Sequence, residues 1–240
     1  GARLKRLFFT SERAVESVKS LAQRAAARHI DVYEVDARTL AALTETETPQ
    51  GLVAVAEFPE HPIREIPKFL SEDAPTIVLI LHDIADPGNA GVLVRSAEAF
   101  GARAVCFGPN AVEPYNDKLV RASAGALFRI ALFTYDAWSE CAAAARKAKL
   151  TVVAADSAAP DVSSVTIDQR VALVIGHERH GLRDIPVADI GRRAGIPQAQ
   201  HADSLNAGVA GSIMLYEISR STGVMGLMAR EHQSAKSQAL

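Results

Sequence analysis

Apolar positions follow a regular alternation over most of this chain. After residue 75, short apolar runs bounded by turn residues alternate with segments whose apolar positions recur every three to four residues. The runs predict strands at 77–84, 103–107, 130–134, 151–155 and 171–175, and the segments predict helices near 89–100, 115–124 and 136–149. A strand–helix unit at 193–220 completes the series. This alternation is typical of parallel strands joined by crossover helices, so an α/β fold is expected.

The first 58 residues show the same pattern on a smaller scale. Strands are predicted at 4–9, 31–35 and 51–58, with a helix from Ser11 to about His29 and a short helix near 37–43. Four prolines between residues 59 and 75 then predict a linker. We therefore expect a small α/β domain at 1–58, a linker at 59–75, a larger domain at 76–225 and a tail at 226–240.

Charge is unevenly distributed although the net charge is only −2. Residues 1–30 hold seven basic and two acidic side chains, a net of +5, whereas residues 31–60 hold one basic and seven acidic, a net of −6. A small domain polarised in this way can present one basic face to phosphates, although a solvated helix of mixed charge explains the pattern equally well.

Other features narrow the class of protein. No run reaches the roughly 18 apolar residues that would suggest a membrane span, and no signal-peptide pattern is present. The two cysteines, Cys106 and Cys141, fit a reducing compartment better than a disulfide framework, which predicts a cytoplasmic protein. The seven histidines are scattered without metal-ligand spacing, so no metal site is expected and most are expected at the surface or in caps.

The segment from Ile196 to Glu217 carries the strongest chemical signal. A strand end meets a proline, a polar loop follows, and Ser204-Leu-Asn206 opens an apolar helix. Asp203 or Ser204 is expected to cap this helix. A helix start that combines a hydroxyl, an amide and free backbone N–H groups can bind a ligand mainly through its main chain. An ordinary capped helix would show the same sequence pattern.

Two further segments must be read together with this one to identify the family that the chain resembles. Residues 82–102 run from a strand through a Pro-Gly turn into a helix, and residues 171–182 form a buried strand that ends in Gly-x-Glu-x-x-Gly-Leu. In this order, the three segments resemble the SpoU/TrmH family of RNA 2′-O-methyltransferases, of the knotted SPOUT class, over about residues 76–222. The resemblance implies a trefoil-knotted, mostly parallel sheet with flanking helices. Residues 1–58 resemble the latter half of a ribosomal-protein-like RNA-binding domain, with its first portion expected to be absent.

The resemblance also implies roles for five catalytic-site residues. Asn89 and Arg95 match the first motif, and Arg95 would contact the reacting ribose or its phosphate. Because guanidinium groups stay protonated near neutral pH, we assign Arg95 to stabilising the developing alkoxide rather than to taking the proton. Glu178 would accept hydrogen bonds, from Asn206 or Arg95, and Ser204 and Asn206 would lie beside the reactive centre. An exposed helical arginine and a salt-bridging glutamate are the plain structural alternatives.

The implied cofactor is S-adenosylmethionine, in a site lined by Gly176, Ile196 and Leu205. The lack of a Cβ at Gly176 would let the cofactor approach the backbone closely. Arg121 and Ser123 resemble RNA-facing positions, with an ordinary helix end as the alternative. The resemblance further implies a protein that acts on ribosomal or transfer RNA as a homodimer paired through the knot region and the final helix.

The final helix has apolar residues that could form this subunit contact, although a fully buried helix would explain them too: Ala207, Val209, Ala210, Ile213, Met214 and Ile218. Its small residues, which include Gly208 and Gly211, would let two helices approach closely.

Three other functions are alternatives to this one. A nucleotide-binding Rossmann enzyme is disfavoured because Asp86-Pro-Gly-Asn-Ala-Gly91 has the wrong glycine spacing. A relative that methylates a base nitrogen is disfavoured by the Ser-Leu-Asn signature of the third segment. A catalytically silent RNA-binding or assembly factor on the same scaffold remains the main alternative, although the five matched catalytic residues argue for activity.

Overall fold

The computed structural model of this protein describes residues 2–12, 16–46, 49–59, 61–177, 180–199 and 204–228. The chain divides into two compact units, Gly1–Pro59 and Glu60–Leu240.

The first unit is a three-stranded sheet with strand order β2-β1-β3. Strand β1 (Arg3–Phe9) pairs in parallel with β2 (Asp31–Glu34) and antiparallel with β3 (Leu52–Glu57). Helix α1 (Glu16–Ala26) packs its alanines against Leu7 of the sheet, and α2 (Ala37–Ala42) follows β2. The Ser11 hydroxyl donates a hydrogen bond to the Glu34 carboxylate. The backbone N–H groups that Ser11 would cap lie outside the described residues, so that cap stays a prediction.

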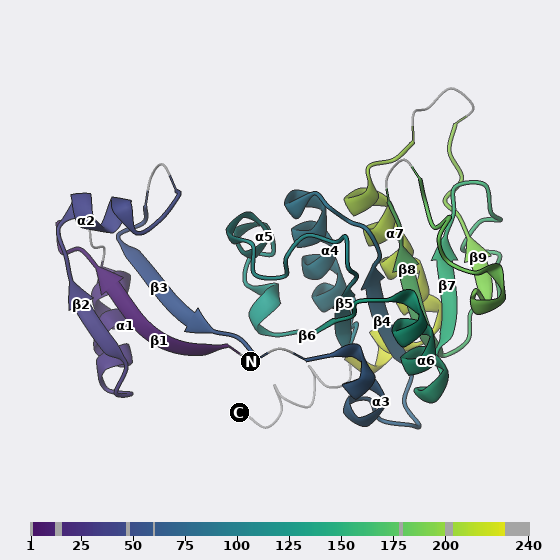
Figure 1. The fold of residues 1–240 in the computed structure, drawn as a ribbon, viewed down its shortest axis with the longest axis horizontal. Helices are drawn as coiled ribbons and strands as arrows, with labels where there is room; N and C mark the ends of the chain where they lie inside the picture. The colour runs from purple at the N-terminus through teal and green to yellow at the C-terminus, as the bar shows by residue number, and fades with distance from the viewer. Residues whose placement is uncertain are drawn as a thin grey trace. The chain divides into compact units, whose positions relative to one another are not determined.

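The second unit is built on six parallel strands in the order β6-β5-β4-β8-β7-β9 (Figure 1). Their bounds are β4 (Thr76–Leu81), β5 (Ala104–Phe107), β6 (Ala131–Thr134), β7 (Thr151–Ala155), β8 (Arg170–Ile175) and β9 (Arg192–Ala194). All six strands lie where the apolar runs predicted them, within a few residues. Every residue of β4 is buried, as expected for a central strand of a parallel sheet that is covered on both faces.

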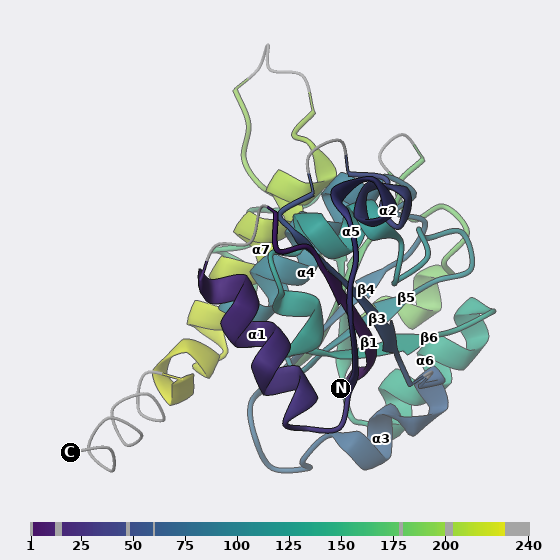
Figure 2. The same cartoon turned by 90° about the vertical axis from the view of Figure 1, so that its left-hand side faces the viewer.

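Helices cover both faces of this sheet. Helices α4 (Pro87–Ala99) and α7 (Ala207–Ser221) lie side by side on one face, with α5 (Asp117–Ala122) and the 3-10 turn η2 (Ala126–Phe128) beside α4 (Figures 1 and 2). Helix α6 (Trp138–Lys147) covers the other face through Cys141, Ala144 and Ala145. A further 3-10 turn, η3 (Val187–Asp189), precedes β9. The mixed α/β architecture with a parallel sheet is therefore confirmed.

The linker expected at 59–75 is wrong over much of its length. Residues 63–69 form a 3-10 turn η1 (Ile63–Glu65) and a short helix α3 (Ile66–Phe69), which pack against α6. Ile63, Ile66 and Leu70 are buried in the core of the second unit. The prolines are compatible with this because Pro67 lies in the first turn of α3, where a helix needs no N–H donor from it.

Candidate active site

Helix α4 begins at the carboxyl end of the central strand. Asp86 caps it, because its Oδ1 accepts a hydrogen bond of 2.8 Å from the backbone N–H of Asn89, and Pro87 occupies the first turn. The cap fixes where the first turn of α4 starts. Asn89 is thereby held within that turn, close to the end of β4.

Helix α7 starts two residues later than expected. Its cap is Asn206, whose Oδ1 accepts from the backbone N–H of Val209 at 3.2 Å, rather than Ser204. Asp203, the other expected cap, lies outside the described residues. Ser204 is an exposed residue of the loop before the cap. Asn206 thus satisfies one of the free N–H groups of the helix with the side chain that the resemblance assigned to chemistry.

The two helix starts are joined by the side chains of the first and third motifs. Asn206 donates through Nδ2 to Oδ1 of Asn89 at 2.8 Å. The residues are 117 positions apart, and sequence reasoning did not foresee this contact. It fixes the amide orientation of both side chains, so two of the five expected catalytic residues form one hydrogen-bonded unit.

Small residues let α4 and α7 approach closely enough for this contact. A Cβ built on Gly211 would lie 2.3 Å from the Leu93 side chain, and one on Gly208 would lie 3.4 Å from the Asn89 backbone. The Ser96 and Ser212 hydroxyls are 2.7 Å apart across the same interface. The glycines that were expected to serve a subunit contact therefore serve this contact within the chain.

A pocket of about 620 Å³ opens at the carboxyl ends of β7, β8 and β9. Gly176, Ile196 and Leu205, the three residues expected to bind cofactor, all line it, together with Ser204. The loop after β8, the loop after β9 and the start of α7 each form one wall. This volume is within the usual range of about 300–1,000 Å³ for small-molecule sites, and such sites lie beyond the carboxyl ends of strands in open α/β sheets.

Packing within the chain gives a further reason for a glycine at position 176, beside the expected approach of a cofactor. A Cβ on this residue would lie 2.4 Å from the carbonyl oxygen of Gly181 and 2.4 Å from the Leu182 side chain. The space that the missing Cβ leaves is therefore filled by the chain's own loop. Gly176 lines the pocket, and packing against the Gly181 backbone and the Leu182 side chain is by itself enough to require a residue without a Cβ here.

Arg95, another expected catalytic residue, lies further along α4. Arg95 is an exposed residue in the third turn of α4. One turn earlier, Gly91 packs against Ala122 of α5, so the face of α4 that bears Arg95 adjoins α5. Glu178 lies outside the described residues, and its expected contacts with Asn206 or Arg95 stay predictions.

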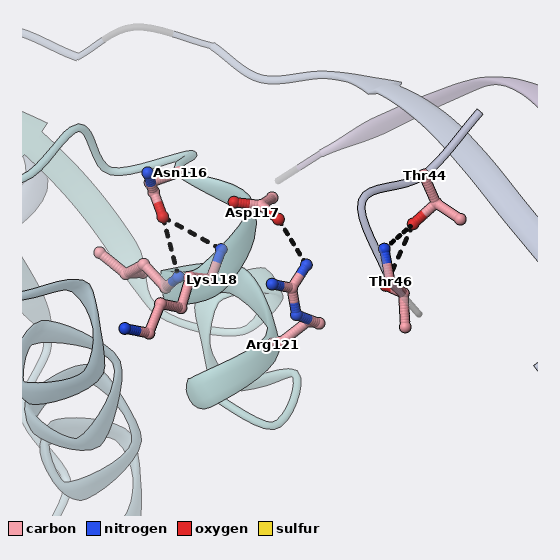
Figure 3. A network of polar contacts seen from close by, with 7 residues as sticks. Thr44, Thr46, Asn116, Asp117, Lys118 and Arg121 are labelled. Carbon is pink, nitrogen blue, oxygen red and sulfur yellow. Dashed lines mark hydrogen bonds and ion pairs between the residues drawn. The ribbon is translucent and has the colours of Figure 1, made fainter. Parts of the chain in front are cut away.

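The two positions expected to face RNA differ sharply in exposure. Arg121 is exposed and turns back toward Asp117, while Asn116 caps α5 by accepting from the backbone of Lys118 at 3.0 Å (Figure 3). The hydrogen bond from Arg121 lowers the pKa of the Asp117 carboxyl. Ser123 is fully buried, and its hydroxyl donates to the Val120 carbonyl at 2.8 Å. In this conformation, Ser123 supports the end of α5 and presents nothing to a ligand.

A buried histidine beside the pocket was missed by sequence reasoning, which expected surface histidines. His82 follows β4 and is only 2% exposed. Its Nδ1 lies 2.7 Å from the Tyr135 hydroxyl, and its Nε2 lies 2.9 Å from the Asp184 carboxylate. Burial alone would raise the pKa of Asp184, but the hydrogen bond from His82 and a backbone N–H bond outweigh it and lower the pKa. The contact ties the loop beyond Leu182, a wall of the pocket, to the central strand.

This cluster is also the one group in the described part of the chain whose geometry could suit a metal. Ligand atoms of His82, Asp83 and Asp184 lie within 4.8 Å of one another. Both ring nitrogens of His82 are already engaged, and Asp83 accepts a hydrogen bond from Asn110 at 2.9 Å. The cluster is therefore explained as a hydrogen-bond network that fastens three loops together.

Comparisons with known proteins agree with the resemblance. A family model described as the SpoU rRNA Methylase family matches residues 76–216, and one described as RNA 2′-O ribose methyltransferase substrate binding matches residues 1–62. A Bacillus subtilis protein named 23S rRNA (guanosine(2553)-2′-O)-methyltransferase RlmP is 29% identical over 190 residues, which are 79% of this chain and 73% of that protein. The chain spans 62% and 65% of two further curated relatives.

Two solved structures extend the likeness to the whole fold. The AdoMet-bound rRNA methyltransferase from Sinorhizobium meliloti has 29% identity and a TM-score of 0.79, over 92% of this chain and 81% of that one. The SpoU methyltransferase AviRb from Streptomyces viridochromogenes, in complex with AdoMet, has 28% identity and a TM-score of 0.78, over 92% of this chain and 83% of that one.

Proposed function

Because the chain belongs to the SpoU rRNA methylase family, we propose that it transfers a methyl group from S-adenosylmethionine to a ribose 2′-hydroxyl of ribosomal RNA. The observation that carries this proposal is the convergence of the second and third motifs on one pocket. Gly176, Ile196 and Leu205 come from two separate loops and line the same cavity. Relatives with 28–29% identity over 92% of this chain were solved with AdoMet bound, which supports the same ligand here.

The pocket suits the proposed cofactor in size and in the chemistry of its walls. Apolar side chains of Ile196, Leu205 and Met214 offer a surface for the flat adenine ring, and polar groups lie on the β7 and β9 side. When bound, S-adenosylmethionine supplies a methyl group already activated by a sulfonium. The protein's own task is then to align the ribose hydroxyl and to handle the charge as its proton leaves.

We propose that the two asparagines, Asn89 and Asn206, fix the geometry of the helix starts at the mouth of the pocket. Asn206 holds the start of α7 and, through its amide, the side chain of Asn89. Residues held by hydrogen bonds on two packed helices lose little freedom when a substrate arrives, which favours a reaction that depends on alignment.

Arg95 is proposed to stabilise the negative charge that develops on the ribose oxygen. It is exposed on a helix that starts beside the pocket, so RNA can reach it. As the 2′-oxygen forms its bond to the methyl carbon, the carbon–sulfur bond breaks and the hydroxyl proton leaves to a separate acceptor. A guanidinium stays protonated in this step and favours the charged oxygen.

The test compares Arg95→Ala with Arg103→Ala, an exposed arginine that immediately precedes β5 and so lies at the amino ends of the strands, away from the pocket at their carboxyl ends. Removing a preorganised contact to a developing oxyanion typically slows transfer by about 10²–10³. Single-turnover transfer of labelled methyl to ribosomal RNA should fall by that factor in Arg95→Ala, with S-adenosylmethionine affinity within a few-fold of wild type. Arg103→Ala should transfer normally. Near-normal transfer by Arg95→Ala would show that another group carries this role.

We further propose a homodimer that pairs through α7. Val209, Ile213 and Tyr216 are 48%, 38% and 40% exposed, and their spacing places them on one face of the helix. Met214 and Ile218, also expected at the subunit contact, are instead buried within the chain. Light scattering at micromolar concentration should give a dimeric mass for wild type and a monomeric mass for Ile213→Glu. Leu21→Glu, a similarly exposed position on α1, should stay dimeric. A monomeric wild type would overturn the proposal.

Among the described residues, no helix is long and apolar enough to cross a membrane.

A further inference from the structure

One acidic side chain faces the proposed cofactor pocket, and no family motif accounts for it. Asp156 is the first residue after β7, and its side chain is 30% exposed. Among the described residues that line the pocket, it is the only carboxylate. Arg183, Arg193, His177 and His180 line the same pocket.

The Asp156 carboxylate is held in a fixed orientation. Its Oδ1 accepts from the backbone N–H of Ala158 at 3.0 Å, and its Oδ2 accepts from Nη1 of Arg193 at 2.9 Å. The Asp156 backbone N–H donates to the Ala194 carbonyl at 3.0 Å, which ties the end of β7 to β9. An ionised carboxylate has about four acceptor sites, so these two donors leave acceptor capacity for a ligand.

The adenosyl group presents two kinds of partner for such a carboxylate. One is the pair of ribose hydroxyls, which are neutral donors, and the other is the sulfonium or ammonium, which are cations. Arg193 already neutralises Asp156 at 2.9 Å, and a second cation placed there would be repelled by the guanidinium. Neutral hydroxyls meet no such repulsion and gain from an acceptor whose geometry is set in advance.

We propose that Asp156 accepts hydrogen bonds from the 2′- and 3′-hydroxyls of the adenosyl ribose, and that Arg193 is the residue that positions it. A carboxylate that grips ribose hydroxyls beyond the carboxyl end of a strand is a general solution in nucleotide-binding α/β proteins. The inference rests on the proposed cofactor and adds the group that recognises its sugar. Asp156 thereby selects adenosyl ligands that carry an intact diol.

Isothermal titration of the full chain tests this with S-adenosylhomocysteine and its 2′-deoxy and 3′-deoxy analogues. In wild type, loss of either hydroxyl should weaken binding by about 10-fold or more, since hydrogen bonds to charged groups are among the stronger ones. In Asp156→Ala, S-adenosylhomocysteine itself should bind about 10- to 100-fold more weakly, and the deoxy analogues should bind no more weakly than the parent. Asp156→Asn, which keeps the shape of the side chain, should give an intermediate result.

Asp161→Asn serves as the matched control. Asp161 lies five residues further on, outside the pocket, where its carboxylate accepts from the Ser163 N–H at 2.9 Å. This variant should keep wild-type affinities for all three ligands. Thermal melting without ligand establishes that each variant is folded at the temperature of titration.

Several results would overturn the inference. If the deoxy analogues lose the same factor in Asp156→Ala as in wild type, the hydroxyls have another partner. If Asp156→Ala weakens S-adenosylmethionine much more than S-adenosylhomocysteine, the carboxylate contacts the sulfonium instead. If wild type binds neither S-adenosylmethionine nor S-adenosylhomocysteine, the proposed function itself fails and this inference fails with it, whereas the first two results leave the proposed function intact.

Discussion

Substitution of Gly176 distinguishes a glycine required by packing from one required by a ligand. In Gly176→Ala, the new Cβ would lie 2.4 Å from the Gly181 carbonyl oxygen, about 1 Å short of the 3.4 Å at which ordinary contact begins. The obstacle is backbone, and Leu182 on its other side is 8% exposed, so neither neighbour can give way freely. We expect the loop after Gly181 to be displaced from β8.

Overpacking of this kind typically costs about 1–3 kcal/mol. In a domain of this size, each kcal/mol lowers the melting temperature by about 2–4 °C, so Gly176→Ala should melt about 2–12 °C below wild type in the absence of ligand. Gly181→Asn is the control, because a Cβ there would meet no described residue within 4 Å and asparagine tolerates its φ of 62°. That variant should melt close to wild type.

The measurement is thermal unfolding by circular dichroism without ligand, followed by titration with S-adenosylmethionine. A Gly176→Ala protein that melts with wild type and yet fails to bind S-adenosylmethionine would refute the packing argument. That result would mean that the space beside Gly176 belongs to the ligand, as the sequence alone suggested.

Two further predictions concern the hydrogen bonds around the pocket. Asn206→Asp keeps an acceptor for the Val209 N–H but has no N–H for Asn89, so it should retain the cap and lose the contact between helices. Asn206→Ala loses both the cap and the contact, so its free energy of unfolding, measured by chemical denaturation, should fall by about 1–2 kcal/mol and clearly more than that of Asn206→Asp. Equal losses in the two variants would show that the cap and the contact do not contribute separately. Because the folded-state pKa of Asp184 is lowered, its ionised form stabilises the protein above the unfolded pKa of about 4, and this stabilisation is lost as the pH falls through the folded value. The stability difference between wild type and Asp184→Asn should therefore shrink on acidification below about pH 4. A difference that is constant with pH would argue against stabilisation of the ionised Asp184 carboxylate by its hydrogen bonds.

The strands and helices of the second unit could be predicted because burial dictates their apolar pattern. A run such as β4, buried at every residue, has no other stable environment in a chain of this composition. The helical turns at 63–69 were missed because prolines dominated the interpretation. The spacing of Ile63, Ile66 and Leu70, three and four residues apart, was the signal that could have revealed them.

The sequence predicted which loops converge to form the pocket. It did not predict which side-chain atoms contact one another there. Residues after β8 and β9 must share one edge of a parallel sheet, so the pocket followed from the pattern. The contact between Asn89 and Asn206 depends on the distance between α4 and α7, which glycine packing sets. The His82 network depends on a side chain from β6's end and a loop 102 residues away, and no local pattern encodes such a contact.

The position of the transferred methyl group tests the central claim most directly. Ribosomal RNA that has been incubated with the protein and methyl-labelled S-adenosylmethionine would be hydrolysed with alkali, which cleaves only where a free 2′-hydroxyl can attack the adjacent phosphate. The account predicts that the label remains in an alkali-resistant dinucleotide, because the ribose oxygen carries the methyl group. Label released in a mononucleotide, with the methyl on a base nitrogen, would contradict it.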